Sequence, residues 1–167
     1  MALYDPAGLA TAGKFPVHIL STLASLDLSA VTVAELTAGT QVDTALTSFK
    51  STSDQSTRDR KMLSDTVAEQ IGGQITRSLD MGTIAAMDPQ NADELKTLLV
   101  EGATLYIVAR PGLGTGVAPA AAQKCWIWKA TVGTIDPAEI TTDDGSEFGW
   151  NVTWTKVTRN LDAVISA

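Results

Sequence analysis

Apolar and polar residues alternate most regularly in two segments near the end of the chain, 124–135 and 147–158. The four tryptophans of the chain all lie there, at even spacings: Trp126, Trp128, Trp150 and Trp154. Because successive side chains of a strand point to opposite faces, each pair shares one face if both segments are strands. Their neighbours on that face are mainly Val and Ala, so we predict that the tryptophans form structural core and not a ligand platform.

The reverse face of these strands has a different character. Asn151, Thr153 and Thr155 lie on it in the second strand, and Thr131 lies on it in the first. These side chains are small, polar and uncharged. Such a face suits contact with water, with a neighbouring subunit or with a passing polymer, and the pattern alone does not choose among them.

Leucines recur at helical spacing in about residues 91–101, which is the one clear helix that the sequence predicts. Leu95, Leu98 and Leu99 form a single stripe, and Gly102 ends the pattern. We therefore predict an amphipathic helix that lies over a sheet and adds these three leucines to its core.

Other segments read as short strands or as irregular chain. Residues 29–36 are rich in β-branched residues, and residues 69–84 alternate around a Gly-Gly turn. Residues 1–16 read as an N-terminal arm, and about 47–70 read as a long polar extended loop. Many short strands with one helix predict a mainly β domain over residues 1–167, a β-sandwich or barrel with one flanking α-helix.

Charge and composition narrow the function. The net charge is −7, which disfavours binding to nucleic acid through phosphate contacts. No run of about 18 apolar residues exists, so we expect no membrane insertion. Charged residues make up only 19% of a chain that holds 22 threonines. This low-charge, Thr-rich composition favours an exterior that is partly covered by copies of the same chain.

The sequence offers no convincing catalytic or metal-binding group. His18 is the single histidine and Cys125 the single cysteine, so a zinc site of four such ligands is excluded. His18 lies in an apolar strand-like run, and we interpret it as a structural residue at a sheet edge or surface. The acidic run in 136–147 is typical of solvated turns. We predict no enzyme activity, no cofactor and no metal.

Five segments together resemble the major tail tube proteins of long-tailed (siphovirus-type) bacteriophages, and they span about residues 31–166, most of the chain. They are ELTAGTQVDTAL (35–46), the polar segment up to Asp65, GGQITRSLD (72–80), ELKTLLVEGATLYIVARPG (94–112) and VTWTKVTRNLDAVIS (152–166). The resemblance implies a virion protein that self-assembles into stacked hexameric rings. The stacked rings form a tail tube, the conduit for genome delivery into the host cell.

The resemblance also implies partners and contact segments. The partners are other copies of the chain and other tail proteins (tape measure, terminator and distal tail), with DNA passing through the channel without specific binding. The protein would be assembled in the host cytoplasm and located in the virion tail. The arm and the loop would be disordered in the monomer and ordered in the tube. Interface residues expected there are Tyr4, Phe15, Phe49, Lys50, Arg58, Arg60, Lys61, Met62 and Leu63.

Two alternatives remain open at this point. One is another small β-fold virion protein, such as a capsid decoration or tail-completion protein. The other is a carbohydrate-binding β module that uses the tryptophans.

Overall fold

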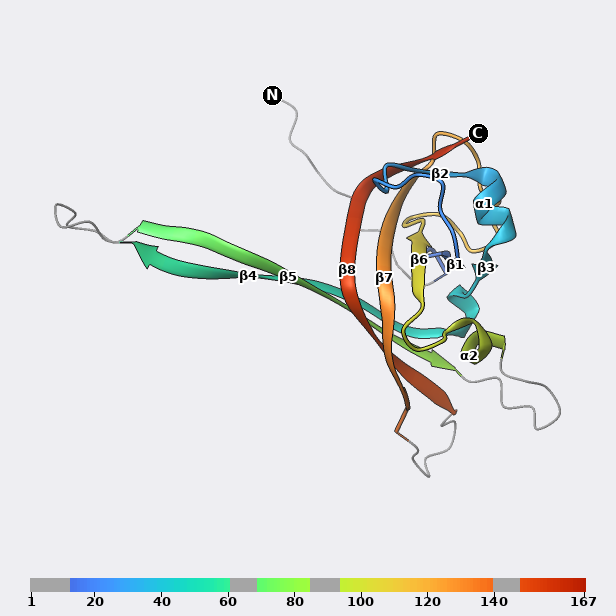
Figure 1. The fold of residues 1–167 in the computed structure, drawn as a ribbon. Helices are drawn as coiled ribbons and strands as arrows, with labels where there is room; N and C mark the ends of the chain where they lie inside the picture. The colour runs from blue at the N-terminus through green and yellow to red at the C-terminus, as the bar shows by residue number, and fades with distance from the viewer. Residues whose placement is uncertain (1–12, 61–68, 85–93, 140–147) are drawn as a thin grey trace.

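The chain forms one curved sheet of eight strands in the residues that the computed structural model describes, 13–60, 69–84, 94–139 and 148–167 (Figure 1). The elements in chain order are β1 (Val17–Leu20), β2 (Ala30–Thr32), α1 (Val33–Ala38), β3 (Thr40–Gln41), the 3-10 turn η1 (Asp43–Ala45), β4 (Leu46–Arg60), β5 (Glu69–Ile84), α2 (Glu94–Leu98), β6 (Thr104–Ala109), β7 (Lys124–Pro137) and β8 (Gly149–Ser166). The predicted mainly β fold is confirmed. It is built as a single bent sheet.

The strand order is β3-β1-β6-β7-β8-β5-β4, and neighbours in this order run antiparallel. β2 lies off this path and pairs in parallel with the end of β8. The long strands β7 and β8 occupy the middle of the sheet. The sheet bends so far that Phe49 of β4 meets Phe15, just before β1, with ring centroids 5.4 Å apart. The two outer parts of the sheet are therefore close together.

The main core fills the inner face of the bend. Trp128 and Trp154 are buried in it, together with apolar residues of β1, β5 and β6. Trp126 and Trp150 are only partly buried and pack against this core from its margin. All four tryptophans thus contact one cluster, as expected if their even spacing marks one face of each strand.

A second core covers the opposite face at one end of the sheet. Cys125 and Ile127 of β7 are completely buried there, beside Ala163 and Ile165 of β8. The segment from Leu20 to Leu36 lies over them and contributes five buried apolar residues to this cluster. The first half of β7 is therefore buried on both faces. Its reverse face becomes polar only further along the strand.

Residues 29–36, predicted as a strand, divide into the short strand β2 and the helix α1. The reason is local: the Thr32 hydroxyl accepts a hydrogen bond from the Glu35 N–H (3.1 Å), and the Glu35 carboxylate accepts one from the Thr32 N–H (2.7 Å). This reciprocal capping box starts a helix immediately after Thr32. Burial raises the pKa of Glu35, but hydrogen bonds from Thr32 and Ala24 outweigh it and leave the pKa below its ordinary value.

The predicted helix at about 91–101 is present in the described residues as α2, which ends at Leu98. Leu99 is fully buried in the main core, and Leu95 and Leu98 pack partly buried against it. Lys96 places its ammonium 4.3 Å from the ring centre of Trp150 on β8, a cation–π contact that ties the helix to the sheet. The helix ends earlier than predicted because residues 101–102 form a turn, with Gly102 at φ +83°.

The segment predicted as an extended loop does project from the body, but residues 47–60 are a strand and not irregular chain. β4 and β5 form an antiparallel hairpin whose outer half extends beyond the rest of the sheet (Figure 1). Residues 47–60 are therefore β-strand within the described chain, and the expectation that the segment is disordered in the monomer and ordered in the tube stays a prediction. Residues 61–68 lie outside the described residues.

Two bulges bend this hairpin, and each faces glycine. Gly72 and Gly73 were predicted to form a turn but lie inside β5, where the pairing shifts between Gln55 and Thr57. A Cβ on Gly73 would collide with Ser56, so the close approach at this bulge requires glycine. The second shift lies at the base of β4, opposite Gly82.

Candidate assembly surfaces

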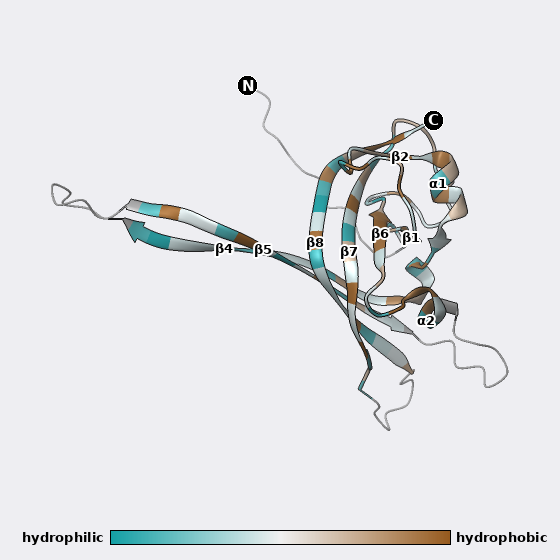
Figure 2. Cartoon of the chain, in the orientation of Figure 1, coloured by the Kyte–Doolittle hydropathy of each residue, from teal (hydrophilic) through white to brown (hydrophobic). Residues whose placement is uncertain are grey.

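The outer half of the β4–β5 hairpin is exposed on both of its faces. Residues 52–59 of β4 are all exposed, as are 72–76 of β5. Figure 2 shows that this part of β4 is hydrophilic throughout. Ile75 nevertheless leaves 47% of its surface exposed. An isolated two-stranded hairpin is at best marginally stable in water, so this segment has the properties of a surface that another molecule covers.

The structure places some of the predicted interface residues and leaves others outside its description. Lys50 and Arg58 are exposed on β4, and Arg60 ends that strand. Phe15 and Phe49 are half-buried and contact each other at the margin of the core. Tyr4, Lys61, Met62 and Leu63 lie outside the described residues. Their role at an interface stays a prediction.

The outer face of β6, β7, β8, β5 and β4 carries hydroxyl side chains in rows across the strands. In one row Thr104 pairs with Thr131 and Thr131 with Thr155. On the other side of β8, Ser78 hydrogen-bonds to Thr52 across β5 and β4. Many of these hydroxyls bond to one another, as between Thr104 and Thr131 (3.1 Å). The face is consequently polar and largely satisfied by its own hydrogen bonds.

A second row crosses the same face one step further along. It contains Thr134 of β7, Thr153 of β8, Asp80 of β5 and Lys50 of β4, all exposed. Thr134 and Thr153 join their hydroxyls at 2.9 Å. The two charges of the row are opposite and are register partners, so the row has no net charge. The threonines noted in the sequence belong to this continuous hydroxyl face.

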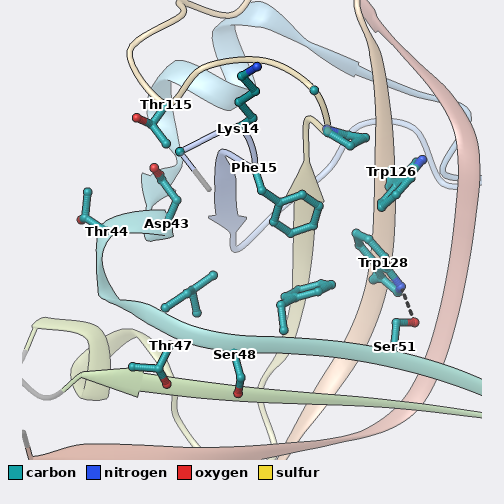
Figure 3. A pocket seen from close by; sticks show the side chains of 15 residues that line it. Lys14, Phe15, Asp43, Thr44, Thr47, Ser48, Ser51, Thr115, Trp126 and Trp128 are labelled. Atoms are coloured by element: carbon teal, nitrogen blue, oxygen red, sulfur yellow. Dashed lines mark hydrogen bonds between the residues drawn. The ribbon is translucent and has the colours of Figure 1, made fainter. Parts of the chain in front are cut away.

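A cavity of about 1010 Å³ opens beside the base of β4 (Figure 3). Its apolar floor is an aromatic cluster in edge-to-face contact: Trp126 lies 6.1 Å from Trp128, and Trp128 lies 5.1 Å from Phe49. Phe15 closes the cluster, 6.1 Å from Trp126. We call this cavity the aromatic pocket. Sequence reasoning missed it because its residues come from three distant segments with no shared motif.

The rim of the aromatic pocket is polar. Lys14, Thr44, Thr47 and Ser48 line it, with Gly112 and Thr115 on the far side, and Asp43 lines it although both of its carboxylate oxygens are buried. The Trp128 indole N–H already donates to the Ser51 hydroxyl at 3.1 Å. The floor therefore offers apolar surface with its buried N–H at Trp128 satisfied, which suits an apolar side chain better than a sugar hydroxyl.

His18 is buried, contrary to its predicted place at a sheet edge or surface. Its Nε2 lies 3.5 Å from the guanidinium of Arg110, which is itself only 1% exposed. Because Arg110 can only donate, His18 must be neutral with an accepting Nε2. Burial and then Arg110 lower the pKa of His18, while Asp43 and the Leu36 carbonyl act in the opposite direction.

His18, Arg110 and Asp43 form a buried cluster whose polar groups are only partly hydrogen-bonded. Arg110 makes one further side-chain hydrogen bond, to Gln123 at 3.4 Å, and its Nε has no partner in the described part of the chain. Both carboxylate oxygens of Asp43 are also buried without a hydrogen-bond partner among those residues. A buried charge without close pairing costs stability.

Arg110 also acts on the pKa of Cys125, but Cys125 does not form a nucleophilic site. Burial raises the pKa of its thiol to about 11, and Arg110 only partly opposes this. The thiol is therefore protonated and inert at neutral pH. In the described residues, no three acidic, His or Cys side chains gather in a way that would hold a metal ion.

None of the helices within the described ranges has the length and apolar character needed to cross a membrane.

Comparison with known families decides the identity at this point. The family model described as phage tail tube protein matches residues 4–167, nearly the whole chain. The chain belongs to the phage tail tube protein family. This family is a structural one, so the protein is a component of the phage tail and hence of the virion. No curated protein sequence matches the chain.

A solved structure shares the fold of this tail tube protein. It is a chain in the cryo-EM structure of the anti-feeding prophage (AFP) baseplate, 6-fold symmetrised. The two are 11% identical, with a TM-score of 0.50, and the likeness covers 95% of this chain and 97% of the other. At this identity the likeness establishes a common architecture over the whole domain.

Proposed function

We propose that this tail tube protein self-assembles into stacked hexameric rings that form the tube of the tail, and that the genome passes through the channel during delivery to the host. The single observation that carries the proposal, beside family membership, is the outer β4–β5 hairpin. It is two strands wide and exposed on both faces. A neighbouring copy that covers it would supply the packing it lacks. We take six copies per ring because the fold neighbour belongs to a baseplate with sixfold symmetry.

The free edge of the sheet supports assembly in the same way. β4 pairs with β5 alone among the described strands, so its other edge presents unpaired N–H and C=O groups. Proteins normally cover or disrupt so long an edge because it recruits other strands. In a ring of identical copies this edge would meet a neighbour. Individual sheets would then join into a continuous wall.

The hydroxyl face is the surface we assign to the channel. A conduit for DNA must not hold phosphates, and in the two rows described above Lys50 is the one cation and has Asp80 as its register partner, so these rows lack the clustered Lys and Arg that phosphate binding requires. Its hydroxyls bond mainly to one another, as between Thr134 and Thr153. The net charge of −7 adds a repulsive field. Such a wall would let DNA pass with little retention.

Electron microscopy of the purified protein tests the assembly. We expect negatively stained wild-type protein to form hollow stacked rings or polytubes. The matched variant replaces residues 56–74 with Asn-Gly, which joins the register partners Gln55 and Ile75 by a two-residue turn. We expect it to keep the tryptophan fluorescence of the body and to lose tube formation. Wild-type protein that stays monomeric and binds glycans would contradict the proposal, as would isolated trimers.

Cysteine labelling tests which face lines the channel. The native Cys125 is buried, and burial raises its pKa to about 11. At neutral pH the maleimide should therefore react only with the added cysteine. We expect Thr155→Cys to react with a large polymer-linked maleimide in the monomer but not in tubes, while a small maleimide reacts in both. Ala34→Cys on the exposed side of α1 is the control. Equal protection of both sites from the large reagent would refute the channel assignment.

A further inference from the structure

Two arginines lie on the inner face of the sheet where the outer hairpin leaves the body. Arg159 of β8 donates to the Ser51 hydroxyl of β4 at 3.2 Å. Arg77 of β5 is the register partner of Ser53, which shares a face of β4 with Ser51. Both arginines are half-buried. The four side chains border one place at the end of the aromatic pocket, and we call it the arginine site.

The arginine site holds positive charge without a neighbouring carboxylate. Within the described part of the chain Arg77 forms no ion pair, and its Nε is buried with no hydrogen-bond partner. The adjacent acids, Asp54 and Asp80, lie at alternate positions of β4 and β5 and so point to the opposite face. A half-buried charge without a partner costs stability. The site therefore has the electrostatics of a surface that an anionic group covers.

The polar groups of the arginine site are mainly hydrogen-bond donors. The Ser51 oxygen accepts from the Trp128 indole N–H at 3.1 Å and from Arg159, so its two lone pairs are used and its O–H remains to donate. A guanidinium can only donate, and both arginines have N–H groups to spare. An ionised carboxylate only accepts, and its two oxygens match the fork of a guanidinium. The site therefore selects a carboxylate.

One segment of the chain is rich in carboxylates and has no cation to neutralise them. Residues 136–147 contain no Lys or Arg and five acids, namely Asp136, Glu139, Asp143, Asp144 and Glu147. Asp136 and Glu139 belong to the described residues and are exposed. Complementary charge of this kind selects one partner surface over others. We call residues 136–147 the acidic segment.

The acidic segment of the same copy starts too far away to reach the arginine site. It leaves the sheet at the end of β7 and β8, where Pro137 pairs with Trp150 (Figure 1). From Trp150 to Arg159 the path along β8 is about 30 Å, at about 3.3 Å per residue. The connection 138–149 is anchored at both ends and reaches out by about half its extended length, about 20 Å. The acidic segment of another copy has no such restriction.

We propose that the arginine site of one copy binds carboxylates of the acidic segment of a second copy. Arg77 and Arg159 supply the charge and the Ser51 O–H supplies a further donor. Phosphate has similar acceptors, but the hydroxyl face assigned to the DNA channel lies on the other side of these strands. The inference rests on the proposed tube function, because it needs a second copy beside the base of the hairpin.

A peptide titration tests the arginine site apart from tube formation. The host is full-length protein in which all five acids of the acidic segment are replaced by their amides, so copies do not fill one another's sites. It is titrated with a peptide of residues 136–147 that is blocked at both ends. We expect saturable binding, followed by tryptophan emission because Trp128 shares Ser51 with the site. Binding should weaken as ionic strength rises.

Matched variants separate the site from general charge. Arg77→Gln in the host should weaken peptide binding at least about tenfold, the loss expected when one partner of a charge pair is removed. Arg58→Gln, which removes the same charge from an exposed position of β4, should not. A peptide with amides at its five acidic positions should not bind. Equal effects of the two arginine variants, or displacement of the peptide by a short DNA duplex, would overturn the inference.

A cross-link in assembled protein makes the test independent of the amide-substituted host. In Arg77→Lys protein a carbodiimide can join the amine at position 77 to a carboxylate in contact with it. Tubes are formed from mixed isotope-labelled and unlabelled subunits. We expect mass spectrometry to find position 77 of one copy joined to the acidic segment of another. Tubes whose cross-links lie within one copy, or miss this segment, would overturn the inference and leave the proposed function supported. Peptide binding without tubes would support the arginine site and count against the proposed tube.

Discussion

The body of the sheet and the outer hairpin are built from strands of similar length, but they differ in how much of each strand the rest of the molecule buries. β7 buries side chains on both faces over its first half, between the main core and the second core. The outer half of β4 buries none. Burial of apolar surface is the main stabilising term in folding, so the body carries its own stability. The hairpin depends for its stability on the body or on a neighbour.

Hydrogen exchange should show the largest difference between the two regions. In the monomer we expect amides of β7 near Ile127 to exchange only on global unfolding, with a protection of about 5–15 kcal/mol. Amides of residues 53–59 should exchange with little protection. In tubes the hairpin should become protected while β7 changes little. A hairpin that is equally open in monomer and tube would show that no neighbour covers it.

Truncation of the central tryptophan should be the costliest single substitution in the body. Trp128 is 2% exposed and loses both its packing and its bond to Ser51 in Trp128→Ala. We expect a loss of about 3–5 kcal/mol in the free energy of unfolding, measured by urea denaturation. Thr155→Ala, on the exposed hydroxyl face, is the control and should change stability by less than about 0.5 kcal/mol. Equal losses would mean that the two faces of the sheet are not distinct.

Removal of the capping box of α1 should lower the free energy of unfolding by less than truncation of Trp128 does. Thr32→Ala removes the hydroxyl that accepts the Glu35 N–H, and we expect a loss of about 1 kcal/mol in thermal or urea unfolding. Thr37→Ala in the same helix is the matched control, since its exposed hydroxyl bonds only to the preceding turn at Val33. No difference between the two variants would argue against the cap as the reason that the helix starts there.

The smallest effect should be a pH dependence from His18. Its pKa in the folded protein is lowered from the ordinary value of 6.5, chiefly by burial and then by Arg110, while Asp43 and the Leu36 carbonyl oppose this. The folded state then binds fewer protons than the unfolded state. Stability is therefore full above pH 6.5 and declines as the pH falls through the folded pKa. His18→Gln should flatten this slope in urea unfolding curves. Asp27 and Glu35 add a similar dependence only below about their ordinary pKa values of 3.8 and 4.5, since folding lowers the pKa of both.

The sequence predicts the parts of the fold where one face is buried within the same chain. The even spacing of Trp126 and Trp128 is visible because their face meets the main core. β4 gives no such signal, since neither of its outer faces is buried and both carry polar residues. Polar strands therefore look like loops until their hydrogen-bonding partner is known. The Gly-Gly pair looks like a turn for the same reason.

Features formed by residues that are far apart in the sequence could not be predicted from the sequence alone. The second core at Cys125 exists only because residues 20–36 fold back over the sheet. The burial of His18 depends on Arg110, ninety-two positions away. The aromatic pocket joins Phe15, Phe49 and Trp126, whose contact follows from the bend of the whole sheet. The start of α1 is readable in principle, since Thr32 and Glu35 have capping-box spacing.

Ser51 lies where the hairpin leaves the body, and its hydroxyl is held by two donors from the sheet. The Trp128 indole N–H lies 3.1 Å away, and the Arg159 guanidinium lies 3.2 Å away. From this anchor to Arg60 the strand acts as a lever about 30 Å long. A tilt of about 10° at the pivot moves the far end by about 5 Å, roughly one strand spacing. The direction in which the outer hairpin projects therefore depends on how firmly these two hydrogen bonds hold Ser51.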